Sequence, residues 1–159
     1  MAGLAYLPAN ECISMSERRL RIIVVEDNEP DVFMVREALE RADLEFELQV
    51  MDDGEKAVNL VEKIDQGEAV PQPDLVLLDL NLPRKSGVQV LERLRKSPRC
   101  ARTPVVILTS SDSPKDRLHA ELLGATQYFQ KPSRLQEFMK LGPLVRELLN
   151  QYGSSAQAV

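Results

Sequence analysis

The stretch Leu75-Val-Leu-Leu78, followed directly by Asp79, decides the fold class of this chain. A short, continuous apolar run of this kind is typical of a strand buried on both faces of a parallel sheet. A second run, Arg21-Ile-Ile-Val-Val25, precedes the pair Glu26-Asp27, and a third forms Val105-Val-Ile-Leu-Thr109. Three apolar runs that each end in polar residues predict the core of an α/β sheet.

Helical spacing of apolar residues fills the segments between these strands. The predicted strands are residues 21–25, 46–50, 75–78, 105–108 and 128–129, and the predicted helices lie at 30–42, 57–64, 88–94, 114–122 and from 133 onward. The connections are long enough for parallel pairing, so we expect an open sheet covered by helices on both faces. In the last helix, Gly142-Pro143 interrupts the spacing and predicts a kink or a break.

The length and composition fit one folded domain. The chain has 159 residues, of which 43% are hydrophobic and 28% are charged. We expect an N-terminal extension over residues 1–19, the folded domain over residues 20–150 and a flexible C-terminal tail over residues 151–159.

Charge and cysteine content argue against several classes of protein. A net charge of −5, spread along the chain, disfavours binding to nucleic acid or to an anionic membrane. No apolar run approaches the roughly 20 residues that span a bilayer, so we expect a cytoplasmic protein with no membrane partner. Cys12 and Cys100 lack the spacing and the neighbouring histidines of a zinc site or a disulfide framework.

Polar residues follow the core strands at the edge where an α/β sheet carries its functional crevice. Three of them are the carboxylates of Glu26, Asp27 and Asp79, which repel one another unless a cation or a lysine compensates. Each one taken alone is also compatible with a solvated strand end. Together, oxygen ligands without histidine or cysteine favour Mg²⁺ or Mn²⁺ over zinc.

The same edge carries the groups that phosphoryl transfer needs. A carboxylate can act as a nucleophile and form an aspartyl-phosphate when a metal, an ammonium and a hydroxyl group stabilise the charge on the phosphoryl group. Asp79 suits the nucleophile, Lys131 the ammonium and Thr109 the hydroxyl.

Over about residues 20 to 150, the chain resembles the receiver domain of two-component response regulators. The motifs that carry the resemblance are Val24-Val-Glu-Asp27, Val76-Leu-Leu-Asp-Leu-Asn-Leu-Pro83 with Gly87, Pro104-Val-Val-Ile-Leu-Thr109, Gly124-Ala125 and Tyr128-Phe-Gln-Lys-Pro132. The resemblance implies a flavodoxin-like (βα)5 fold with a doubly wound five-stranded parallel sheet in the order 2-1-3-4-5. It also implies a phosphoacceptor signalling protein that catalyses only its own phosphorylation and slow dephosphorylation.

The resemblance assigns a role to each residue of the strand-end cluster. Asp79 is expected to accept a phosphoryl group from a sensor histidine kinase, and Thr109 and Lys131 are expected to contact the phosphoryl oxygens. Tyr128 is expected to move with Thr109 as the switch. The expected ligands of Mg²⁺ are Glu26, Asp27, Asp79 and the main-chain carbonyl of Asn81. The resemblance further implies a cis peptide bond between Lys131 and Pro132, which aims the lysine at Asp79.

Within the family, the loops look most like those of single-domain regulators paired with bacterial phytochrome kinases. The residues after Leu149 are too few and too polar to form an output domain, so the signal is expected to leave from the surface or through a phosphorelay. A homodimer through the fourth helix, fifth strand and fifth helix is one such route. The candidate contacts are Leu118, Leu122, Phe129, Leu141 and Gly142-Pro143.

Two other classes of protein are compatible with parts of this pattern, and one surface feature has two interpretations. A haloacid dehalogenase type of phosphatase needs a second aspartate at position 81, where this chain has Asn81. A degenerate receiver that only binds proteins is disfavoured by the intact Asp79, Thr109 and Lys131. The basic run from Arg93 to Arg102 is expected to be a solvated face or, less favoured, a docking patch for a kinase.

Overall fold

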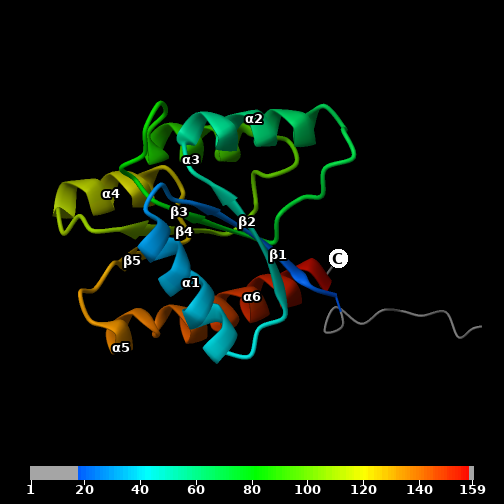
Figure 1. Cartoon of the computed structure of the whole chain (residues 1–159). Helices are drawn as coiled ribbons and strands as arrows, with labels where there is room; N and C mark the ends of the chain where they lie inside the picture. The colour runs from blue at the N-terminus through cyan, green and yellow to red at the C-terminus, as the bar shows by residue number, and fades with distance from the viewer. Residues whose placement is uncertain (1–17, 158–159) are drawn as a thin grey trace, which may run out of the picture.

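The computed structural model describes residues 18–157 of the chain, which form a single sheet flanked by helices (Figure 1). The strands are β1 (Leu20–Val25), β2 (Phe46–Met51), β3 (Leu75–Leu78), β4 (Val105–Thr109) and β5 (Gln127–Gln130). The helices are α1 (Glu29–Arg41), α2 (Gly54–Asp65), α3 (Gly87–Lys96), α4 (Pro114–Leu122), α5 (Leu135–Phe138) and α6 (Leu141–Gln157). The strand order is β2-β1-β3-β4-β5, and all pairs are parallel, which confirms the predicted fold class.

The sheet separates two hydrophobic layers. Successive residues of β1 point to opposite faces, so that Ile22 and Val24 pack on one side while Ile23 and Val25 pack on the other. Helices α1, α5 and α6 cover the first side, and α2 and α3 cover the second, as Figure 1 shows. Burial on both faces explains why the central strands are apolar without interruption.

The strand order reverses between β1 and β3. The chain moves from β1 outward to β2, returns to β3 and then continues in the other direction to β4 and β5. Glu26 follows β1 and Asp79 follows β3, and the main-chain N–H of Asp79 donates to the carbonyl of Val25 at 3.0 Å. The two carboxylates therefore lie at the switch point, where sheets of this class bind their ligands.

The last predicted helix is broken in two, as the sequence indicates. Helix α5 ends at Phe138 and α6 begins at Leu141, so that Pro143 falls in the first turn of α6, where a missing N–H does no harm. Gly142 allows α6 to approach α1 closely, because a Cβ at this position would lie 2.3 Å from the carbonyl oxygen of Ala38. The predicted break thus has a packing reason.

Helix α6 runs through the predicted domain boundary at residue 150. Residues 151–157 are helical rather than an unstructured tail. A single glycine, Gly153, costs a helix only about 1 kcal/mol, and no proline follows to stop it. Of the predicted N-terminal extension, residues 1–17 lie outside the described residues, and Arg18 is held to Asp74 by an ion pair of 2.7 Å.

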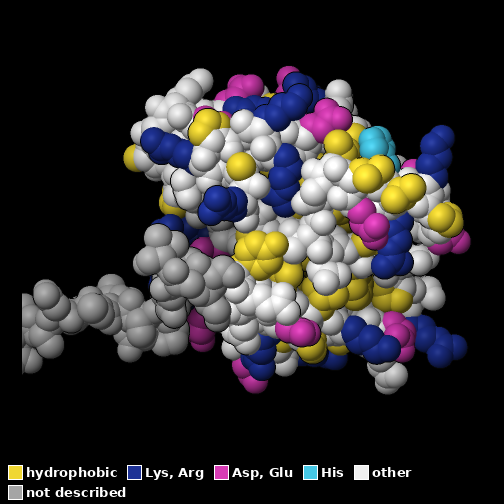
Figure 2. Space-filling view, turned by 180° about the vertical axis from the view of Figure 1, so that it is seen from behind, with side chains coloured by type: hydrophobic (Ala, Val, Ile, Leu, Met, Phe, Trp, Pro, Cys, Tyr) yellow, Lys and Arg dark blue, Asp and Glu magenta, His cyan; other side chains and the backbone are white. Residues whose placement is uncertain are grey.

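Cys100 is buried and forms no disulfide with another described residue, while Cys12 lies outside them. No helix within residues 18–157 is long and apolar enough to cross a membrane. Acidic, basic and scattered hydrophobic side chains share the face of the molecule seen from behind (Figure 2).

Candidate functional site

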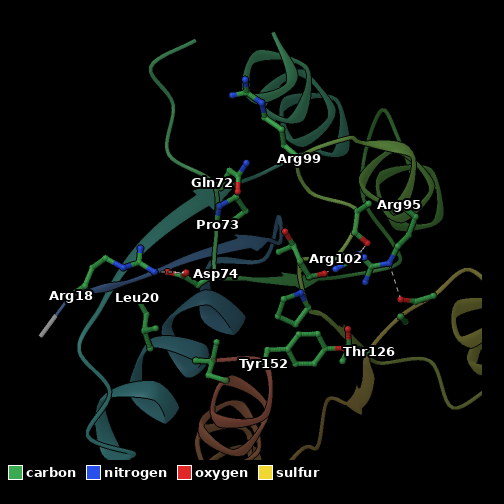
Figure 3. A pocket seen from close by; sticks show the side chains of 16 residues that line it. Arg18, Leu20, Gln72, Pro73, Asp74, Arg95, Arg99, Arg102, Thr126 and Tyr152 are labelled. Atoms are coloured by element: carbon green, nitrogen blue, oxygen red, sulfur yellow. Dashed lines mark hydrogen bonds and ion pairs between the residues drawn. The ribbon is translucent and has the colours of Figure 1, made fainter. Parts of the chain in front are cut away.

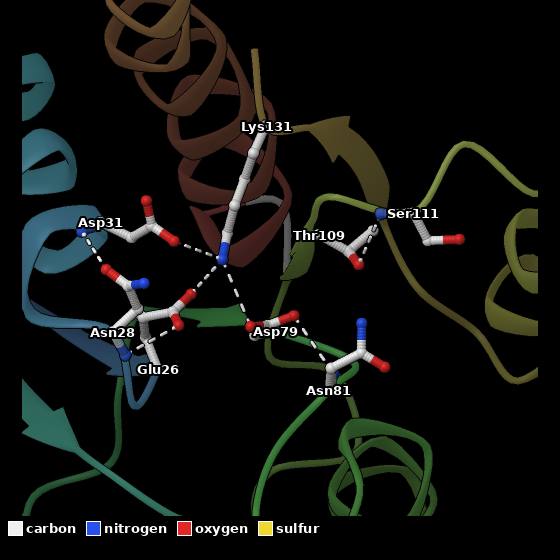
Figure 4. A network of polar contacts seen from close by, with 8 residues as sticks. All are labelled: Glu26, Asn28, Asp31, Asp79, Asn81, Thr109, Ser111 and Lys131. Atoms are coloured by element: carbon white, nitrogen blue, oxygen red, sulfur yellow. Dashed lines mark hydrogen bonds and ion pairs between the residues drawn. The ribbon is translucent and has the colours of Figure 1, made fainter. Parts of the chain in front are cut away.

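The polar side chains predicted for the site meet at the carboxyl edge of the sheet (Figure 4). Glu26 follows β1, Asp79 follows β3, Thr109 is the last residue of β4 and Lys131 follows β5. The main-chain N–H of Lys131 donates to the carbonyl of Thr109 at 2.7 Å, which extends the pairing of β4 and β5 by one residue. The sheet itself therefore positions these four residues.

Lys131 lies at the centre of the carboxylates and is almost entirely buried. Its Nζ donates to Glu26 Oε2, to Asp31 Oδ2 at 2.8 Å and to Asp79 Oδ2 at 3.2 Å. One ammonium thus serves three carboxylates, which matches the compensation that the sequence requires. The sequence did not predict Asp31 as part of this network.

Three carboxylates in this crevice can hold a cation together. Oxygen atoms of Glu26, Asp27 and Asp79 all lie within 4.8 Å of one another. Glu26 and Asp79 are buried, whereas Asp27 is exposed, so the cluster is open to solvent on one side. Carboxylate oxygens with room for water fit a hard divalent cation such as Mg²⁺ or Mn²⁺.

Burial raises the pKa of the Glu26 carboxyl to about 7, and the charge of Asp79 adds to this effect, while the hydrogen bond from Lys131 opposes it. For Lys131, burial alone would lower the pKa. The hydrogen bonds to Asp31 and Glu26, together with the charge of Asp79, outweigh burial and raise the pKa above its usual value. The lysine therefore remains an ammonium at neutral pH.

The loop from β3 to α3 is held close to Asp79. The main-chain N–H of Asn81 donates to Asp79 Oδ1 at 3.1 Å, and that of Gly87 donates to the carbonyl of Leu80 at 3.0 Å. A Cβ at Gly87 would lie 2.1 Å from the carbonyl oxygen of Asp79, so only glycine fits there. This packing places Asn81 directly beside the carboxylate of Asp79 (Figure 4).

Thr109 and Tyr128 are connected through one residue, Ser111. The fully buried Thr109 accepts a hydrogen bond at Oγ1 from the main-chain N–H of Ser111 at 3.2 Å. The Tyr128 hydroxyl donates to the carbonyl of Ser111 at 3.1 Å, and Ser111 Oγ donates to Asp116 on α4 at 2.7 Å. A shift of Thr109 would therefore change the contacts of Tyr128 and of α4.

One expectation about the backbone is wrong. No cis peptide bond occurs among the described residues, so the bond between Lys131 and Pro132 is trans. The aim of the lysine does not depend on a cis bond, because its long side chain reaches Asp79 Oδ2 at 3.2 Å from the trans backbone.

Not all the residues predicted for a dimer contact lie on the surface, since Gly142 is buried whereas Pro143 is exposed. Leu118 and Leu122 on α4 are 56% and 76% exposed, and Phe129 is half-buried. Leu141 is completely buried in the core against α1, which corrects its prediction as a surface residue. The helical period places Leu141 inward because α6 begins there with its apolar face toward the sheet.

The sequence did not predict the contacts that two residues make at the site. Asp31 lies in the first turn of α1, where the helix dipole stabilises an acidic side chain. This position alone accounts for an aspartate there, so the sequence gives no sign of its contact with Lys131. Ser111 lies two residues after Thr109, a spacing typical of hydroxyl-to-backbone turns. That spacing was a usable signal for Ser111, whereas nothing local pointed to the contact of Asp31.

The fold and the edge cluster together define the receiver class of signalling proteins, and the chain belongs to the response regulator receiver domain family, which it matches over residues 22–141. It is 35% identical over 120 residues to the response regulator Rcp1 of Synechocystis sp., covering 76% of this chain and 82% of Rcp1.

Two solved structures resemble the chain along most of its length. The crystal structure of the phosphorylated cyanobacterial phytochrome response regulator RcpA has a TM-score of 0.74 at 31% identity, covering 83% of this chain and 94% of RcpA. The Mn²⁺-bound form of Rcp1 has a TM-score of 0.69 at 33% identity, covering 77% of this chain and 88% of that one.

Proposed function

We propose that the chain accepts a phosphoryl group on Asp79 from the phosphohistidine of a sensor histidine kinase, with Mg²⁺ bound beside it. The observation that carries this proposal is the triple contact of Lys131 with Glu26, Asp31 and Asp79 at the carboxyl edge of the sheet. Incubation with acetyl phosphate and Mg²⁺, followed by intact-mass measurement, tests it by the gain of one phosphoryl group.

The residues of the site have different roles in the phosphoryl transfer. Asp79 Oδ attacks the phosphorus, a P–O bond forms, and the bond from phosphorus to the donor nitrogen or oxygen breaks as the donor leaves with its electron pair. The Lys131 ammonium offsets the negative charge of the phosphoryl oxygens, and the Thr109 hydroxyl donates a hydrogen bond to one of them. Glu26, Asp27, Asp79 and the Asn81 carbonyl would hold Mg²⁺, which supplies positive charge to the transferring group when it is bound.

The kinase partner that we propose is of the bacterial phytochrome type. The support is the similarity to Rcp1 and to RcpA, which is a cyanobacterial phytochrome response regulator. Transfer from a radiolabelled phytochrome kinase, compared with a labelled kinase of another sensory class, tests this assignment. We expect at least tenfold faster labelling by the phytochrome kinase, and equal rates would contradict it.

Removal of divalent cations should stop phosphorylation. Without a cation, Glu26, Asp27 and Asp79 repel the incoming anion, and Lys131 is their only compensating charge among the described residues. We expect no phosphoryl adduct from acetyl phosphate in excess EDTA and full recovery when Mg²⁺ or Mn²⁺ is added in excess. Phosphorylation at the normal rate in EDTA would show that the acidic cluster has another role.

Replacing Thr109 by alanine should separate phosphorylation from its consequences. Phosphorylation adds about two negative charges to the crevice, and the Thr109 hydroxyl, with the Ser111 loop attached to it, is the donor we expect to move inward. The Thr109→Ala variant should still be phosphorylated, while the fluorescence change of Tyr128 on phosphorylation falls by at least about half. Coupling between sites commonly amounts to roughly 1–3 kcal/mol. A response equal to that of the wild type would leave Thr109 with no role in switching.

A homodimer through α4, β5 and the helices that follow β5 is part of the proposal. Leu118 and Leu122 are one helical turn apart and exposed, and burying a leucine contributes about 1.5–3 kcal/mol. We expect a dimer mass by light scattering and a monomer for the L118E/L122E variant, with F33S, which removes an exposed apolar residue on α1, as control. A monomer at high concentration, both with and without phosphorylation, would remove the dimer from the proposal.

A further inference from the structure

A pocket of about 830 Å³ lies at the edge of the sheet opposite to the carboxylate cluster (Figure 3). Its walls include Leu20, Asp74, Pro104 and Thr126, which stand at or just before the first residues of β1, β3, β4 and β5. The strands are parallel, so their first and last residues occupy opposite edges of the sheet. The proposed phosphoryl transfer makes no use of this pocket.

The charge that lines this pocket is mainly positive. Arg95 and Arg102 line it, and neither forms an ion pair with a carboxylate within residues 18–157. The guanidinium of Arg99 lies at the rim, beside Gly67. The one carboxylate of the lining, Asp74, is already engaged by Arg18 at 2.7 Å and by a main-chain N–H at 2.8 Å. On a molecule whose surface mixes both signs (Figure 2), this concavity favours an anion.

Arg95 is fixed in place by the loops around it. Its Nε donates to the carbonyl of Gly124 at 2.9 Å, and its Nη1 donates to the carbonyls of Ala101 and Thr103 at 3.2 and 2.8 Å. Its Nη2 donates to no other described residue, and no fully buried side-chain nitrogen in the described part of the chain lacks a partner, so Nη2 is not fully buried. A guanidinium that is already ordered loses little entropy when it binds an anion.

An aromatic ring lies in the same pocket. Tyr152 projects from α6 into the lining of the pocket (Figure 3), and it is 39% exposed. A partly exposed ring next to guanidinium groups offers a flat surface on which another ring can stack. The volume of the pocket is within the range of small-molecule sites, roughly 300–1,000 Å³.

We propose that this pocket binds a phosphorylated small molecule with a planar ring, of the nucleoside monophosphate class. Arg95 and Arg102 would bind the phosphate, because planar guanidinium groups form charge-assisted hydrogen bonds with phosphate oxygens. The ring of the ligand would stack on Tyr152. Inorganic phosphate alone would leave the ring surface unused, and a nucleoside alone would leave the two charges without a partner.

Calorimetric titration of the full chain tests the proposal with four probes. These are adenosine, guanosine and uridine monophosphate, together with inorganic phosphate. We expect saturable binding of at least one nucleotide, at least tenfold tighter than that of phosphate. The R102Q variant should weaken this binding at least tenfold, and Tyr152→Leu should weaken binding of the nucleotide but not of phosphate. Phosphorylation by acetyl phosphate should stay normal in all variants, which separates this test from that of the proposed function.

The matched control is the R36Q variant. It removes the same charge from an exposed arginine that does not line the pocket, and it should bind the nucleotide as the wild type does. An equal loss in the control and the pocket variant would show a general charge effect and overturn the proposal. The absence of saturable binding by all three nucleotides, or phosphate binding as tight as theirs, would overturn it as well.

Discussion

The Asp79→Asn variant is expected to gain no phosphoryl group from acetyl phosphate or from a phosphorylated kinase. The substitution keeps the shape of the side chain and can still accept the hydrogen bond from Asn81 N–H. It removes the nucleophilic oxygen and one of the carboxylates around Lys131. Intact mass should show a single unmodified species after a time in which the wild type is fully converted.

Asp43→Asn is a matched control for this experiment. Asp43 is an exposed carboxylate in the turn after α1, with a φ of 57° that asparagine adopts as readily as aspartate. It lies before β2, at the opposite edge of the sheet from the site. This variant should be phosphorylated at the wild-type rate, and a phosphoryl adduct on Asp79→Asn at that same rate would place the acceptor elsewhere.

The strand and helix pattern was predictable because the core strands are buried on both faces. Leu75–Leu78 contains no polar residue, and neither does Val105–Leu108, so both are recognisable as buried strands. The carboxyl edge followed from this pattern, since parallel strands deliver their last residues to one side. The positions of Glu26, Asp79, Thr109 and Lys131 at that edge thus agree with the sequence.

Features that depend on side-chain length or on packing between distant helices were not predictable. The burial of Leu141 depends on how closely α6 approaches α1 at Gly142. The trans bond at Pro132 is compatible with the site only because the lysine side chain is long enough to reach Asp79. Asp31 joins the site across 100 residues of sequence, and its contact with Lys131 exists only after α1 and β5 are assembled.

The other large effect is expected from Lys131→Met, measured as stability in urea with EDTA present. Methionine keeps the apolar stem of lysine but leaves Glu26, Asp31 and Asp79 without an ammonium. Removing one partner of a buried ionic cluster leaves uncompensated charge, so the free energy of unfolding at pH 8 should fall by about 3 kcal/mol. In the Asp31→Asn control, Lys131 keeps Glu26 and Asp79, and the loss should be less than half as large.

The loss in Lys131→Met should shrink as the pH falls. The pKa of Glu26 is raised to about 7 in the folded wild type, so its contribution to stability is fully present below the ordinary value near 4.5 and is lost as the pH rises through 7. Without Lys131, which lowers this pKa, the folded variant should hold the Glu26 proton to a still higher pH. At pH 5.5 the protonated Glu26 no longer repels Asp79, and the variant should recover at least about half of its deficit. A deficit that is unchanged or larger at pH 5.5 would show that Lys131 stabilises the fold through packing rather than through charge.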